Sequence, residues 1–201
     1  YSHDLVYENS REYFREDLNK SIKILEDLIG KKIDTYRAPG FSVTSNTKWY
    51  IEEIVRAGIK IDSSIFPAAR GHGGFPSFSD SNPSIVSYKN YEVKEFPINL
   101  ANFFGKPFIF SGGGYFRLLP TITLKYFFSR SEYTMTYFHM RDFDKNQPSI
   151  DMNFIRKFKS YYGIKSCWDK YQTILDTYDF IDLKTANSKI DWKSVKKNVL
   201  I

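Results

Sequence analysis

The chain has 201 residues, a formal net charge of +6, 42% hydrophobic residues and 18% aromatic residues. This length and apolar content exclude a disordered polymer and fit one globular domain with a substantial core. The basic residues are scattered except for a short lysine cluster near residue 196, so we interpret the charge as a solvated surface and expect no nucleic-acid partner. Such a basic surface also suits acidic glycans or anionic lipid headgroups.

The cysteine content limits the kind of metal site and the cellular compartment. Cys167 is the only cysteine, which excludes an intrachain disulfide and a thiolate zinc site, so a metal would use His, Asp or Glu. No run approaches the roughly 20 apolar residues of a membrane span, and we expect no integral membrane segment. The lack of disulfides favours the cytoplasm.

The first predicted element is an amphipathic helix between Ser10, a good N-cap, and Gly30, a natural C-terminal stop. A short strand over residues 33–36 then delivers Arg37, and Pro39 begins a turn. The apolar residues of the helix recur at helical spacing at Phe14, Leu18, Ile22, Leu25 and Ile29.

A second helix is predicted from Thr44 or Ser45 to Gly58, and a strand over residues 59–62 follows it. The pattern then breaks into Pro, Gly, Ser and Phe over residues 63–114, which we interpret as a long insertion of the kind that carries binding specificity. Short extended runs within this insertion are predicted at residues 85–88 and 93–98. Its closing glycine run, residues 112–114, lacks the Lys-Ser/Thr ending of a phosphate-binding loop, so we predict a backbone turn there.

The last third of the chain continues the alternation of helices and strands. We predict helices over residues 118–128, 153–161 and 168–175, and strands over residues 133–138 and 180–183. Such alternation predicts an α/β domain in which the carboxyl ends of parallel strands converge. His3, Arg37 and His139 would then share one site despite their distance in sequence.

Four short segments carry a resemblance to a known family. They are Tyr1-Ser2-His3, Arg37-Ala38-Pro39, the stretch 62–67 that begins at Asp62, and Thr136-Tyr137-Phe138-His139. In this order they resemble the His-Ser/Thr-x-x-His, Arg-x-Pro, Asp-x-x-x-Trp and late histidine motifs of the polysaccharide deacetylase family, carbohydrate esterase family four, in its bacterial exopolysaccharide-associated branch. The first histidine of the family's metal motif would lie four positions before His3, and the paired aspartates are also missing from these residues.

The resemblance implies a fold and an activity. The fold would be the family's distorted (β/α) barrel, lacking its first strand-helix-strand portion, as one domain over residues 1–201. The activity would be metal-dependent hydrolysis of N-acetyl groups, or as a second choice O-acetyl groups, on a bacterial polysaccharide or oligosaccharide. The partner would be an acetylated glycan. The alternative is a non-catalytic carbohydrate-binding or assembly module derived from a deacetylase.

The resemblance also implies roles for single residues. His3 would be one imidazole ligand of a divalent metal, zinc by preference and otherwise cobalt or nickel. His139 would be the general acid that protonates the leaving amine, a role that suits the ordinary histidine pKa of about 6.5. Arg37 would orient the carboxylate of the general base. Asp62 would hold His139 or the arginine in place, or would simply cap the turn after its strand.

The expected substrate contacts lie around these motifs, at Pro39, Phe41, Phe66 and His72. Phe66 stands where many relatives have tryptophan, so the acetyl pocket would be lined differently. His72 lies between two glycines and is either a substrate contact or an ordinary turn residue. Asp142 and Asp144 follow His139 and either bind a cation or sugar hydroxyls or cap the loop.

Overall fold

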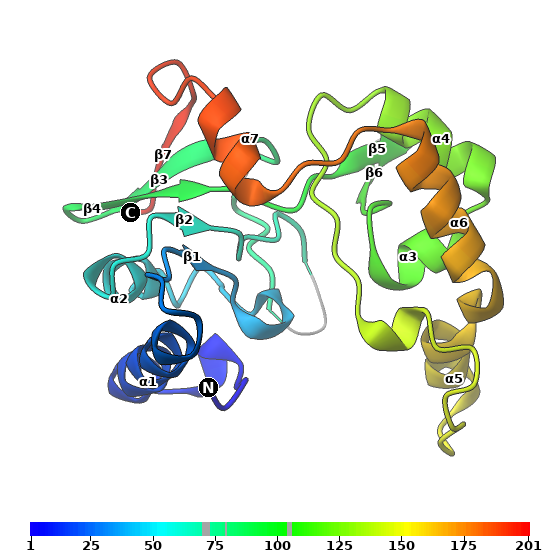
Figure 1. Ribbon diagram of the computed structural model, residues 1–201, viewed down its shortest axis with the longest axis horizontal. Helices are drawn as coiled ribbons and strands as arrows, with labels where there is room; N and C mark the ends of the chain where they lie inside the picture. The colour runs from blue at the N-terminus through cyan, green and yellow to red at the C-terminus, as the bar shows by residue number, and fades with distance from the viewer. Residues whose placement is uncertain (70–72, 79, 104–105) are drawn as a thin grey trace. The chain divides into compact units, whose positions relative to one another are not determined.

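The computed structural model describes residues 1–69, 73–78, 80–103 and 106–201 (Figure 1). The chain divides into two compact units. Unit 1 comprises Tyr1–Ile98 and Asp191–Ile201, and unit 2 comprises Asn99–Ile190. Each unit has its own hydrophobic cluster and is described by itself.

Unit 1 is a mixed α/β structure built, in the described part of the chain, on a five-stranded sheet of order β1-β2-β4-β3-β7. Pairings β1–β2, β2–β4 and β3–β7 are parallel, and the hairpin β3–β4 is antiparallel. The sheet is therefore mostly parallel, as the alternation of elements predicts. Its strands are β1 (Thr35–Tyr36), β2 (Ile61–Asp62), β3 (Ser84–Tyr88), β4 (Tyr91–Glu95) and β7 (Lys197–Val199).

The long helix of unit 1, α1 (Arg11–Ile29), confirms the predicted helix at both ends. The Oγ of Ser10 accepts a hydrogen bond from the backbone N of Tyr13 at 3.2 Å. Gly30 ends the helix with a left-handed φ of 65°, a conformation that a residue without Cβ adopts at little cost. Two short 3₁₀ helices, η1 (Val6–Glu8) and η2 (Pro39–Phe41), precede and follow α1 along the chain.

The second helix, α2 (Tyr50–Arg56), begins later than the sequence predicts. Thr47 Oγ1 accepts a hydrogen bond from the backbone N of Thr44 at 2.8 Å, so the side chain holds this segment in a turn instead of a first helical turn. The buried face of α2 joins the core through Tyr50, Ile51 and Ile54, which cluster with Phe14 of α1.

An ion-pair cluster joins α1 to α2. The side chain of Glu53 has no exposed surface, and its carboxylate lies 2.5 Å from Arg11 Nε and 2.7 Å from Arg15 Nε. A hydrogen bond from Arg15 lowers the pKa of Glu53 against the opposing effect of burial, and Arg11 lowers it further. Because the two arginines lie on successive turns of the same face of α1, this cluster fixes that helix against α2.

Unit 2 is mainly helical. A two-stranded antiparallel sheet of β5 (Ala101–Phe103) and β6 (Lys106–Phe108) opens it. Phe110, Phe127 and Phe128 form its core with Cys167, and burial raises the pKa of the Cys167 thiol to about 11. Its helices are α3 (Gly113–Leu118), α4 (Thr121–Ser129), the 3₁₀ helix η3 (Met140–Asp142), α5 (Phe154–Tyr161), α6 (Ile164–Thr177) and α7 (Leu183–Lys189). No described helix is both long and apolar enough to cross a membrane.

Two predicted strands are wrong. Residues 133–138 form only an isolated parallel bridge between Gly112 and Tyr137. The bridge extends no further because the partner segment turns into α3 immediately after Gly112. Residues 180–183 form no strand because Asp182 Oδ1 accepts from the backbone N of Thr185 at 2.7 Å and caps α7 instead.

The sequence also missed several elements, among them β7 and α3. Strand β7 lies in the lysine-rich tail, where its pairing with β3 places it at one end of the sheet order and where no apolar alternation reveals it. Helix α3 begins within the glycine run for which we predicted a turn. A Cβ at Gly112 would lie 2.1 Å from the carbonyl oxygen of Tyr137, so only glycine permits this close approach.

Replacing Glu53 tests the ion-pair cluster. The folded pKa of Glu53 lies below its ordinary value of 4.5, so its stabilisation is present above that value and is lost as the pH falls through the folded pKa. Glu53→Gln should lower the free energy of unfolding by about 2 kcal/mol near neutral pH. Urea unfolding followed by circular dichroism measures this change.

The matched control for this experiment is Glu16→Gln, at an exposed position of α1. It should change the free energy of unfolding by less than about 0.5 kcal/mol. Equal losses for Glu53→Gln and Glu16→Gln would show that the cluster does not stabilise unit 1.

Candidate functional site

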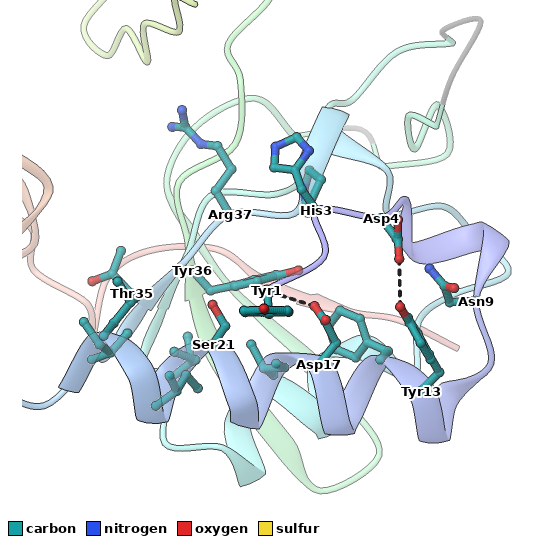
Figure 2. A pocket seen from close by; sticks show the side chains of 17 residues that line it. Tyr1, His3, Asp4, Asn9, Tyr13, Asp17, Ser21, Thr35, Tyr36 and Arg37 are labelled. Carbon is teal, nitrogen blue, oxygen red and sulfur yellow. Dashed lines mark hydrogen bonds and ion pairs between the residues drawn. The ribbon is translucent and has the colours of Figure 1, made fainter. Parts of the chain in front are cut away.

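Unit 1 contains a pocket of about 310 Å³ between the N-terminal segment, α1 and β1 (Figure 2). Apolar side chains such as Phe14 and Leu18 form part of its wall. His3, Arg37 and Pro39, three of the residues predicted from sequence, all line it. Figure 2 shows the side chains of His3 and Arg37 extending away from α1 at one side of this pocket.

The segment that carries His3 is anchored on both sides of the histidine. Ser2 Oγ donates a hydrogen bond to Asp17 Oδ1 at 2.7 Å. Tyr13 OH donates to Asp4 Oδ2 at 2.9 Å (Figure 2). His3 itself has a φ of 61°, a conformation that is uncommon for a residue with a side chain. The two anchors from α1 therefore hold an exposed imidazole in a constrained backbone position.

Arg37 follows β1 and is held by the loop that follows β2. Its Nε donates to the carbonyl oxygen of Ser63 at 3.1 Å, and its terminal NH2 donates to Ser63 Oγ at 2.8 Å. The backbone N of Ala38 donates to Ser64 Oγ at 2.8 Å. These contacts bring the carboxyl ends of two adjacent parallel strands together, as expected for an α/β sheet.

The aromatic residues predicted to bind substrate lie in the interior of unit 1. Phe41 and Phe66 are both buried, and their ring centroids are 5.8 Å apart. Neither ring lines the pocket, whereas Pro39 does. The guanidinium carbon of Arg37 lies 5.4 Å from the centroid of the Phe41 ring, so the ring packs against the arginine.

Asp62 ends β2 and is fully buried. Its Oδ2 accepts a hydrogen bond from Tyr50 OH at 3.0 Å, and its Oδ1 accepts from Ser64 Oγ at 2.5 Å. The Ser64 contact caps the turn after β2, which is one of the two roles that the sequence suggested for Asp62. Because Ser64 also holds Ala38, the carboxylate positions the segment that contains Arg37 through one intervening residue.

Glu95 is the buried partner of Asp62 and was missed by sequence reasoning. It lies opposite Asp62 in the parallel register of β2 and β4, and its Oε1 accepts from the backbone N of Ile65 at 2.9 Å. Burial raises the pKa of Glu95 well above its ordinary value, and the neighbouring charge of Asp62 raises it further. The pair therefore keeps a proton to a higher pH than a carboxyl group in water does.

His139 belongs to unit 2, where its side chain is 70% exposed. Its backbone N donates to Asp142 Oδ2 at 2.9 Å, and its Nδ1 lies 3.8 Å from the same oxygen. Asp142 is buried and forms an ion pair with Arg117 at 3.0 Å. Asp142 thus holds the loop, while Asp144 accepts from the backbone N of Asn146 at 3.0 Å.

The structure gathers some of the predicted residues of unit 1 around one pocket. Within unit 1 the pocket gathers His3, Arg37 and Pro39, and Asp62 lies beneath the Arg37 loop. The prediction that His72 contacts substrate falls outside the described residues. Among the residues that the structure describes, no three His, Cys, Asp or Glu side chains form a group that could hold a metal ion.

The model of a domain of unknown function, DUF3473, matches residues 63–187. The chain belongs to the DUF3473 family. This domain is found at the C-terminal end of polysaccharide deacetylase-like proteins. No curated protein and no solved structure gives a significant match. The DUF3473 match begins directly after β2, so it includes His139 and leaves His3, Arg37 and Asp62 before it.

The buried acid pair predicts an unusual pH dependence of stability. The pKa of Glu95 is raised in the folded protein above the ordinary glutamate value of 4.5. The stabilisation from this group is therefore fully present below pH 4.5 and is lost as the pH rises through the folded pKa. In the unchanged protein the free energy of unfolding should therefore fall by up to about 1.4 kcal/mol per pH unit as the pH rises. Glu95→Gln should remove this fall, because glutamine does not titrate. Urea unfolding from about pH 5 to about pH 8 measures it.

Glu92→Gln serves as the control because Glu92 lies on the same strand with its side chain 54% exposed. Its pH profile should follow that of the unchanged protein. A Glu95→Gln protein with that same profile would mean that Glu95 is ionised in the folded state at neutral pH.

Proposed function

We propose that the protein hydrolyses N-acetyl groups, or as a second choice O-acetyl groups, on a bacterial polysaccharide or oligosaccharide. The observation that carries this proposal is the pocket of unit 1, which gathers His3, Arg37 and Pro39. These residues belong to the segments that resemble deacetylase motifs, and they precede the DUF3473 match. We propose with it that the mostly parallel sheet is part of a distorted (β/α) barrel.

A divalent metal, zinc by preference, would polarise the acetyl carbonyl and lower the pKa of a bound water. The exposed imidazole of His3 at the pocket fits one ligand position of such a site. The resemblance assigns the other ligands to a histidine and a paired aspartate motif that would precede His3. The general base that activates the water would also precede His3.

The residues of this chain would serve the reaction in distinct ways. Hydrolysis adds the water oxygen to the acetyl carbon, breaks the C–N bond, releases acetate and leaves a free amine that must gain a proton. His139, whose side chain is exposed, would give that proton to the nitrogen. Arg37, held by Ser63 and backed by Phe41, would orient the carboxylate base.

Acetate release from an acetylated glucosamine oligomer tests this function in the complete gene product that contains these residues. His139→Gln should lower kcat by about 10² to 10⁴ because the leaving amine loses its acid, while the metal content stays unchanged. His3→Gln should lower the metal content as well as the activity, because a ligand is lost. Elemental analysis of each protein separates the two effects.

Met140→Gln is the matched control, since Met140 adjoins His139 and its side chain is 88% exposed. It should leave kcat unchanged. A protein that releases no acetate and holds the oligosaccharide equally well in the presence of a chelator would refute the enzyme. That result would favour the carbohydrate-binding module.

A further inference from the structure

Helix α5 turns its large apolar side chains to solvent. None of its residues is buried, and Phe154, Ile155 and Phe158 are 82%, 66% and 44% exposed. Phe154 and Phe158 are four residues apart and so share one face, which continues to Tyr162, exposed at 49%. A contiguous apolar face on an exposed helix marks an interaction surface.

This helix is held in place by polar contacts at both ends. Asn153 Oδ1 accepts from the backbone N of Arg156 at 2.9 Å and caps its start. At its other end the buried Arg117 donates to the carbonyl oxygens of Lys159, Ser160 and Tyr162 at 2.9–3.1 Å. An isolated helix of this length is unstable in water, so these contacts maintain a helix whose apolar face remains outside the core.

The charged residues of α5 itself have one sign, and the acidic residues next to it in sequence are Asp151 and Asp169. Residues 152–168 contain no Asp or Glu, and they contain Arg156, Lys157, Lys159 and Lys165. At 100° per residue, Lys157 and Lys159 fall on either side of the stripe formed by Phe154, Phe158 and Ile155, and Arg156 falls behind it. The long stems of the flanking lysines can lie along an apolar layer while their ammonium groups reach a negatively charged plane.

We infer that the α5 face docks on an anionic lipid surface, with the rings of Phe154 and Phe158 at the boundary between headgroups and acyl chains. Aromatic and aliphatic side chains on one face, bordered by basic residues and by no acidic ones, are typical of helices that lie in the membrane interface. A protein groove of mixed charge would gain nothing from basic residues on both flanks, whereas an anionic plane attracts all of them.

Vesicle co-sedimentation of the complete protein tests this inference. The probes are vesicles of phosphatidylcholine alone and vesicles of equimolar phosphatidylcholine and phosphatidylglycerol. Binding should require phosphatidylglycerol and weaken with added salt. The double variants Phe154→Ser/Phe158→Ser and Lys157→Gln/Lys159→Gln should each bind at least about tenfold more weakly.

The control variant is Ile122→Ser, because Ile122 is 79% exposed on α4 of the same unit. It should bind vesicles as the unchanged protein does. Urea unfolding of every variant checks that the helix is still folded. Acetate release plays no part in this experiment, so its outcome is independent of the proposed enzyme activity.

Any of four results would overturn the inference. The first is no binding to either vesicle, and the second is equal binding to neutral and anionic vesicles. The third is an equal loss for Ile122→Ser. Self-association that depends on Phe154 and Phe158, without vesicle binding, would make this face a protein interface and would also overturn it.

Discussion

The buried carboxyl pair of Asp62 and Glu95 constrains how unit 1 is built. Removing two acids from water is costly unless hydrogen bonds and a shared proton compensate. The donors that compensate come from Tyr50 of α2 and from Ser64 and Ile65 of the loop after β2. The position of α2 and the path of that loop therefore depend on the pair. Since the loop in turn holds Arg37 and Ala38, one wall of the pocket depends on it as well.

A buried ion pair positions parts of unit 2 in a similar way. Arg117 and Asp142 are both buried and lie 3.0 Å apart. Asp142 fixes the backbone of His139, and Arg117 fixes the end of α5. The Arg117–Asp142 pair thus supports both His139 and helix α5. Loss of either member would leave the other charge buried without a partner, which is a costly state.

The sequence predicted best what short-range interactions determine. Helix α1 was predicted with both its ends because Ser10 and Gly30 act locally, and the mostly parallel sheet follows from the alternation of elements. Glu95 was missed because a charged residue in an alternating strand indicates an exposed position, and only its partner across the sheet explains its burial. Strand β7 depends equally on a distant partner. The pocket gathers His3 with Arg37, whereas a joint site with His139 stays a prediction.

The burial of Cys167 has a practical consequence for the study of unit 2. A thiol with a pKa of about 11 that is packed among aromatic rings reacts very slowly with alkylating reagents, because reaction requires an exposed thiolate. Since the chain contains no other cysteine, its rate of alkylation reports the opening of this one helical core. The molecule therefore carries a native probe for local opening of unit 2.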